Sequence, residues 1–93
     1  MTNKIDQILA ERDQRYGKFK DHATISQKLK SAIAEHMTQE NFDSMQPDQL
    51  EALDMICHKL GRIANGDPHY ADSWRDIAGY ATLVADRLEG VER

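Results

Sequence analysis

Apolar residues recur at intervals of three and four along most of the chain, which is the spacing of one face of an α-helix. Four segments show this spacing, and we expect a helix at residues 4–16, 21–37, 47–64 and 72–89. The third begins at Pro47, a favourable first residue for a helix, and Asn65-Gly66 ends it. No useful stretch alternates apolar and polar residues as a half-buried strand does. The pattern therefore predicts an all-α protein.

The segments between these helices predict the organisation of the chain. Gly17 ends the first helix, and residues 38–46 are expected to be a loop that Phe42 and Met45 attach to the body. Residues 1–93 then form one domain, a compact helical bundle of about four helices. Its parts are an N-terminal helix and turn (1–20), a helix and loop (21–46) and a helical hairpin that carries the candidate site (47–93). So short a bundle buries a modest core, and we expect a homo-oligomer.

The third helix has two different sides on a helical wheel. Its apolar stripe has the spacing of a helix-packing seam and consists of Leu50, Leu53, Cys57, Leu60 and Ala64, widened by Ile56 and Ile63. The opposite side carries Glu51, Asp54, Met55, His58, Arg62 and Asn65, with Lys59 just outside. One interpretation is a solvated face. However, solvated faces favour Glu–Lys pairs, so this mixture also indicates a binding surface.

The fourth helix repeats the pattern with Asp72 and Asp76, which are four residues apart and point the same way. Either Asp72 caps the helix while Asp76 pairs with Arg75 or Arg62, or both carboxylates hold Mg²⁺ together with phosphate oxygens. Glycine is costly inside a helix. Gly61 and Gly79, in the third and fourth helices, therefore suggest a close helix crossing.

A further candidate lies at residues 15–20, where Tyr16 and Phe19 alternate with basic residues around a glycine. Such a segment can stack a base and contact phosphate, although charged turns are common.

Composition narrows the function classes. A net charge of −4 disfavours a duplex-DNA binder, which normally has a basic excess. No apolar run approaches the length of a membrane span, and the first residues do not resemble a signal peptide, so we expect a cytoplasmic protein. A single cysteine, Cys57, excludes an internal disulfide and a cysteine-based zinc cluster. Its place on the apolar stripe predicts a packed small side chain.

The runs His58–Asp67 (HKLGRIANGD) and Asp72–Ala81 (DSWRDIAGYA), with Arg15-Tyr16-Gly17 upstream, resemble a family of small phage and prophage proteins over nearly the whole chain. More distantly, the Asp-Ile-Ala-Gly-Tyr helix is similar to that of the MazG-like all-α nucleotide pyrophosphohydrolases. That resemblance implies an oligomeric helical protein that binds Mg²⁺ through carboxylates on two helices. It also implies cleavage of nucleoside triphosphates to monophosphate and pyrophosphate.

The match to the MazG-like pattern of Glu-x-x-Glu on one helix and Glu-x-x-Asp on the next is partial. Asp76 matches the final Asp, but Ser73 stands at the preceding acidic position and Asp72 is displaced by one residue. For a hydrolase, the resemblance implies a Mg²⁺ site formed by Glu51, Asp54, Asp72 and Asp76. Basic and amide groups crowd the same region, and such mixed charge suits direct binding of an anionic nucleotide.

We therefore expect a phage-type, non-catalytic nucleotide-binding protein that sequesters a nucleotide immune signal, such as a cyclic oligonucleotide, to counter host defence. His58, Lys59 and Arg62 are expected to face phosphate. Asn65 would contact base or sugar, and Tyr16 or Tyr80 would stack. The first alternative is a Mg²⁺-dependent nucleoside triphosphate pyrophosphohydrolase. The second is a protein–protein interaction module that binds a host protein through an apolar groove, its polar stripes merely solvated.

Overall fold

The computed structural model of the chain describes residues 4–91, which fold into five α-helices. Their bounds are α1 Lys4–Tyr16, α2 Phe19–His36, α3 Gln39–Ser44, α4 Pro47–Asn65 and α5 Ala71–Leu88. The predicted all-α helical bundle is confirmed, and the four predicted helices occur with ends that differ by at most two residues. No helix in the described range is long and apolar enough to cross a membrane.

The segment between α2 and α4 differs from the expected loop, because it contains the short helix α3. The hydroxyl of Thr38 caps this helix by accepting a hydrogen bond of 3.1 Å from the backbone N–H of Asn41. Phe42 lies at the edge of a groove between α2 and α4, but its side chain stays mostly exposed. Of the two predicted anchors, Met45 is half-buried and lines a groove between α4 and α5, whereas Phe42 is not buried.

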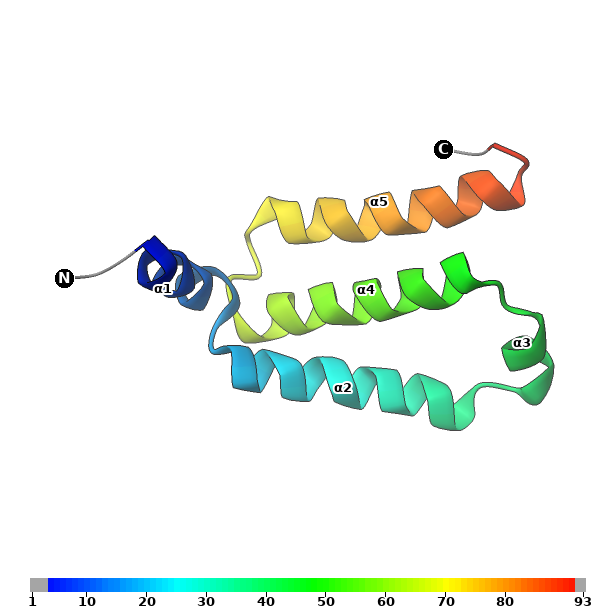
Figure 1. Ribbon diagram of the computed structural model, residues 1–93, viewed down its shortest axis with the longest axis horizontal. Coiled ribbons are helices and arrows are strands. Elements are labelled where there is room, and N and C mark those ends of the chain that lie inside the picture. Colours follow the sequence, from blue (N-terminus) through cyan, green and yellow to red (C-terminus); the bar gives the residue numbers. More distant parts are fainter. Residues whose placement is uncertain (1–3, 92–93) are drawn as a thin grey trace.

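The three long helices lie side by side, with α4 between α2 and α5 and with α1 beside one end of the layer (Figure 1). Within the described residues, α2 and α5 do not contact each other. The chain measures 53 × 30 × 23 Å, and its radius of gyration is 15.7 Å. A globular chain of this length has a radius of gyration of about 12 Å. The molecule is thus elongated rather than spherical.

Small residues let α4 approach its two neighbours. Cys57 and Gly61 are buried on the side that faces α2, where the Ser26 hydroxyl donates a hydrogen bond of 3.3 Å to the Cys57 carbonyl. Ala52 is buried in the α4–α5 half of the layer, where it lines the grooves between these two helices. A Cβ atom at Gly61 would overlap Ser26 and His22 of α2. The close approach at this glycine is confirmed, but its partner is α2.

The other helix glycine behaves differently. A Cβ atom at Gly79 would meet nothing within 4 Å, so the predicted close crossing of the third and fourth helices at Gly61 and Gly79 is wrong. The fourth helix does pack on the third, through other residues.

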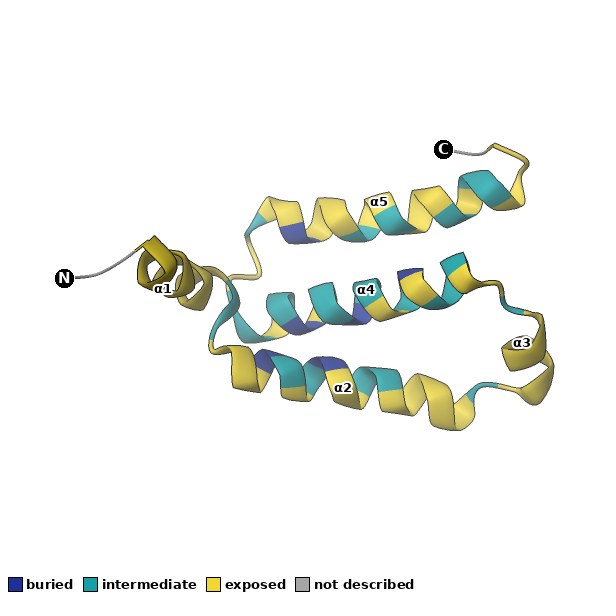
Figure 2. Cartoon of the chain, viewed as in Figure 1, coloured by how far each residue is buried: buried dark blue, intermediate teal, exposed yellow. Residues whose placement is uncertain are grey.

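Burial is unevenly distributed over this layer (Figure 2). Among the described apolar residues only Ala52 and Cys57 are buried, and the prediction that Cys57 is a packed side chain is confirmed. Leu60, at the centre of the predicted packing seam of α4, remains 38% exposed. The predicted seam is therefore only partly covered within one chain: Cys57 packs towards α2, whereas Leu60 and Ala64 stay exposed.

Candidate functional site

Two turns contact each other at the end of the layer where α1 meets α4. One joins α1 to α2 (residues 17–18) and the other joins α4 to α5 (residues 66–70), and we call their contact the clasp. The side-chain amide of Asn65 donates hydrogen bonds of 3.1 Å to the carbonyls of Tyr16 and Lys18. The backbone N–H of Asp67 donates to the Arg15 carbonyl at 2.6 Å. Asn65 therefore fixes the turn between α1 and α2. Both of its amide protons are used within the chain, whereas a role towards a base or sugar was expected for this residue.

Glycines make this clasp possible. Gly17 has a φ of +73°, a conformation that side chains of L-residues rarely adopt. A Cβ atom at Gly66 would overlap the backbone of Arg15 and Tyr16, which cannot give way as a flexible side chain could. The clasp thus places Tyr16 against α4.

The clasp arranges a stack of aromatic and cationic groups. The Arg62 guanidinium carbon lies 4.1 Å from the centre of the Tyr16 ring, within the range of a cation–π interaction. The Tyr16 ring makes an edge contact with Tyr70, at 6.2 Å between centres, and Arg15 lies 5.0 Å from the Tyr70 ring. Tyr16 is therefore in contact with Arg62 on one face of its ring and packs at a steep angle against the Tyr70 ring.

Two histidines lie next to this stack. The His22 and His58 ring centres are 4.5 Å apart, and Nε2 of His22, buried on α2, lies 3.1 Å from the His58 carbonyl. Because a carbonyl only accepts hydrogen bonds, Nε2 of His22 carries the proton. The exposed ring of Phe19 lies 5.8 Å from that of His22.

The surroundings keep both imidazoles uncharged. Burial, followed by the positive charge of Arg62, lowers the pKa of His58 to about 4. Burial also lowers the pKa of His22, against the opposing effect of its hydrogen bond to the His58 carbonyl. At neutral pH the charge of this cluster comes from its arginines.

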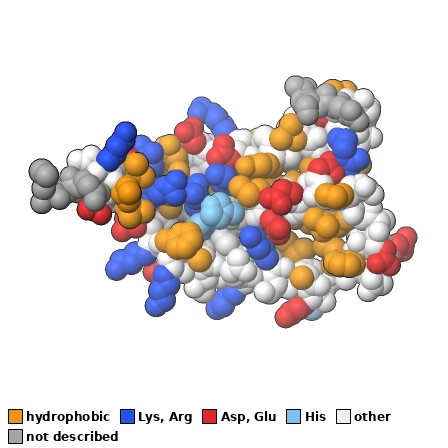
Figure 3. Space-filling view, in the orientation of Figure 1, with side chains coloured by type: hydrophobic (Ala, Val, Ile, Leu, Met, Phe, Trp, Pro, Cys, Tyr) orange, Lys and Arg blue, Asp and Glu red, His pale blue; other side chains and the backbone are white. Residues whose placement is uncertain are grey.

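These groups line an open cavity of about 300 Å³, which we call the cationic pocket. Its lining includes Arg12, Tyr16, Phe19, His22, His58 and Arg62, with Asp13 as an acidic member. In the view of Figure 3, Lys and Arg side chains gather next to a histidine near the centre of the molecule. The structure thus brings together three of the predicted ligand residues, which are Tyr16, His58 and Arg62.

Arg62 is the least satisfied group of the pocket. Its Nε atom is buried without a hydrogen-bond partner in the described part of the chain. None of the ion pairs found among residues 4–91 involves Arg62. A guanidinium has five N–H donors, and burying one without an acceptor costs free energy. The pocket lining therefore includes a cation that no ion pair among the described residues neutralises.

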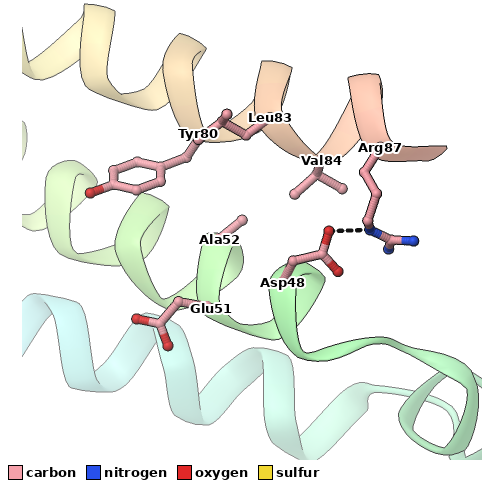
Figure 4. Close-up of a pocket in the computed structure, with 7 residues that line it drawn as sticks. All are labelled: Asp48, Glu51, Ala52, Tyr80, Leu83, Val84 and Arg87. Carbon is pink, nitrogen blue, oxygen red and sulfur yellow. Dashed lines mark hydrogen bonds and ion pairs between the residues drawn. The ribbon is translucent and has the colours of Figure 1, made fainter. Parts of the chain in front are cut away.

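Lys59 and Tyr80 lie elsewhere. The ammonium of Lys59 is 2.9 Å from a carboxylate oxygen of Asp76, and its side chain is only 11% exposed. This ion pair joins α4 to α5 and engages Lys59, which was expected to face phosphate. Tyr80 lines a second cavity of about 470 Å³ between α4 and α5, beside the Asp48–Arg87 ion pair (Figure 4).

The four carboxylates predicted to hold Mg²⁺ are not brought together. Asp76 pairs with Lys59, and Asp72 accepts hydrogen bonds from the Tyr70 hydroxyl at 3.0 Å and from Arg75 at 3.3 Å. Asp54 borders the α2–α4 groove, whereas Glu51 borders the α4–α5 cavity and points away from Tyr80 (Figure 4). No group of three or more His, Cys, Asp or Glu residues in the described range is placed to hold a metal.

Two members of the pocket, His22 and Arg12, do not stand out in the sequence as ligand residues, whereas Phe19 belongs to the candidate base-stacking segment 15–20. His22 and Ser26 are polar residues four apart in the sequence, a spacing that places both on one side of a helix. In the structure this side of α2 packs against Gly61. Phe19 follows the predicted turn, and its closeness to His22 depends on α2 beginning at residue 19. Arg12 enters the pocket only because the clasp docks α1 against α4.

Comparison with known proteins gives one match. A family model described as a domain of unknown function (DUF6378) matches residues 1–88. No curated protein and no solved structure matches the chain. The matched range includes all five helices, so the clasp and the cationic pocket both lie within the family's domain.

Proposed function

The chain belongs to the DUF6378 family, whose function is unknown, and we propose that it binds a nucleotide in the cationic pocket and releases it unchanged. Arg62 carries this proposal, because its guanidinium lines the pocket and makes no ion pair among the described residues. A phosphate group supplies negative charge and several acceptor oxygens in the fork geometry that a guanidinium prefers. The neutral imidazole of His58 can donate or accept a further hydrogen bond.

The aromatic rim of the pocket favours a nucleotide over a simple phosphate. Phe19 is 74% exposed, although an aromatic ring gains free energy when it is covered. A base stacked on an aromatic ring contributes roughly 1–3 kcal/mol, and any base can do so. We assign the stacking role to Phe19, since Tyr16 is already covered by Arg62 and Tyr80 lies in the second cavity.

Binding without turnover is supported by the placement of the carboxylates. The hydrolase alternative needs several of them around one Mg²⁺ ion, whereas Asp76 is bound to Lys59 and Asp72 to Arg75. A small protein that holds a nucleotide in the cytoplasm without converting it acts by sequestration. A cyclic oligonucleotide signal of host immunity is our candidate, on the basis of the resemblance to phage proteins.

A filtration experiment tests this proposal. The protein is incubated with linear (deoxy)nucleoside triphosphates and with cyclic di- and trinucleotides, with and without Mg²⁺. The mixture is filtered, the retained protein is heat-denatured, and both fractions are analysed by chromatography. A nucleotide that is retained and returns intact on heating supports the proposal. Monophosphate and pyrophosphate formed only with Mg²⁺ would instead establish the hydrolase, and passage of every compound would exclude the nucleotide site.

A further inference from the structure

One side of the α4–α5 helix pair is mostly apolar, and no charged residue lines the groove there. A groove of about 330 Å³ runs along it between α4 and α5, lined by Leu53 and Ile56 on one side and by Ala81, Ala85 and Leu88 on the other. Leu60 lies one helical turn beyond Ile56, and Trp74 lies seven residues before Ala81, so both extend the same face. We call these seven residues the apolar face.

The apolar face is not covered within the chain. Trp74 is 53% exposed and Leu60 is 38% exposed, and Leu88 is also exposed at the far end of α5. Contiguous exposed apolar surface of this kind is rare on monomeric proteins and marks an interaction site.

The total accessible surface area of the chain indicates how much surface a partner could cover. A compact monomer of 10.6 kDa exposes about 5,500 Å². This chain exposes 7033 Å², which is about 1,500 Å² more. One subunit of an obligate homodimer buries roughly 1,000–2,500 Å². The excess includes the surface of the exposed helix α1 and is large enough to contain one side of an obligate dimer interface.

We propose that a second copy of the chain covers the apolar face, so that the protein is a homodimer. Ala52 and Cys57 are the only buried apolar residues in the described range, and so small a core needs a partner whenever the chain is folded. A second copy is always available. A twofold dimer sets the same surface against itself, and the absence of charge on this face avoids repulsion between like charges.

The dimer does not depend on the proposed nucleotide site. His58 and Arg62 lie on the opposite side of α4 from Leu53 and Leu60, so a second copy on the apolar face leaves the cationic pocket open. Failure of one proposal therefore leaves the other intact.

Sedimentation equilibrium on the full chain and on two matched variants tests the dimer. We expect the wild-type mass to be twice 10.6 kDa and Leu60→Lys to halve it. The control is Leu83→Lys, since Leu83 is 50% exposed and lines the second cavity, away from the apolar face. This variant should stay dimeric. A wild-type mass of 10.6 kDa, or an unchanged mass for Leu60→Lys, would overturn the proposal.

A second measurement needs only the wild-type chain, in case Leu60→Lys does not fold. Trp74 is the single tryptophan of the sequence, so its fluorescence reports on the apolar face alone. In the dimer Trp74 should be protected from quenching by iodide, and dilution should shift its emission to longer wavelength. Free access of iodide to Trp74 in the folded protein at all concentrations would contradict the dimer and would leave a different protein as the partner.

Discussion

Arg62 is a cation that the fold holds in place without an ion pair among the described residues. Its guanidinium lies on the Tyr16 ring, next to the uncharged His58. The same positive charge that disfavours an imidazolium at His58 favours an anion in the pocket. The spacing of polar residues on the third helix predicts that His58 and Arg62 share one face. The contribution of Phe19 depends on how the first turn docks, which no helical wheel shows.

The depressed pKa of His58 predicts that stability falls in mild acid. In the unfolded chain a histidine has a pKa of about 6.5, whereas in the fold that of His58 is about 4. Between these values the unfolded chain binds the proton and the folded chain does not, so stability is highest above pH 6.5 and falls as the pH approaches 4. We expect a loss of about 2 kcal/mol from this group.

Urea unfolding at pH 7.5 and pH 4.5 measures this loss, and His58→Gln provides the comparison. The variant lacks the titrating group, so its stability should depend less steeply on pH. Equal pH dependence in the two proteins would show that His58 is not held uncharged by the fold.

Phe19 allows a test of which part of the ligand contacts the rim. Phe19→Ala should weaken nucleotide binding about tenfold, because it removes a base-stacking surface worth roughly 1–3 kcal/mol. Competition by inorganic phosphate for Arg62 should stay unchanged, since Phe19 has no role towards phosphate. Competitive titration against the retained nucleotide measures both effects. If Phe19→Ala binds the nucleotide with wild-type affinity, then the base does not stack on Phe19.

At the scale of the helices, α4 shows how far periodicity predicts packing. Its ends and its two sides are predictable from Pro47, Asn65-Gly66 and the apolar stripe. Its neighbours are not, because a middle helix makes contact on two sides, and here small residues allow the close approach. Small residues such as Ala52 and Gly61 add little to the apolar stripe that a helical wheel displays. The stripe therefore contains both a residue packed against α2, Cys57, and an uncovered one, Leu60.

The clasp between the α1–α2 turn and the end of α4 gives a prediction about two glycines. Gly66→Ala should lower the free energy of unfolding by about 2–4 kcal/mol, because its Cβ overlaps the backbone of Arg15 and Tyr16. Gly79→Ala is the matched control, since its Cβ enters open space within α5 and alanine favours a helix by about 1 kcal/mol. This change should stabilise the protein.

Thermal and urea unfolding of both variants measure the two effects. Opposite signs are expected for Gly66→Ala and Gly79→Ala. If Gly66→Ala is as stable as the wild type, then the two turns are not in the close contact that positions Tyr16.

At the scale of the molecule, the three-helix layer has two chemically different faces. The cationic pocket opens on the side of α4 that carries His58 and Arg62, and the apolar face lies on the other. The sequence predicts a small core and self-association, but the contacts of α4 with α2 and α5 show which face is left for a partner. Such an arrangement assigns one face to assembly and the other to a ligand.

A dimer that forms through this face should unfold at a midpoint that depends on protein concentration. We expect the urea midpoint to rise when the concentration is raised from about 1 to 100 μM, because dissociation accompanies unfolding. Leu83→Lys should show the same dependence. A midpoint that is constant over this range would indicate a monomer that is stable alone.

The measurement that tests the binding site most directly is a calorimetric titration of the retained nucleotide into three proteins. Arg62→Met removes the charge but keeps an apolar side chain against Tyr16, and Arg75→Met removes an exposed arginine of α5. We expect affinity to fall about 10- to 100-fold for Arg62→Met, the range for a lost hydrogen bond to a charged group, and to stay within about twofold for Arg75→Met. Equal affinity of wild type and Arg62→Met would show that the nucleotide does not bind in the cationic pocket.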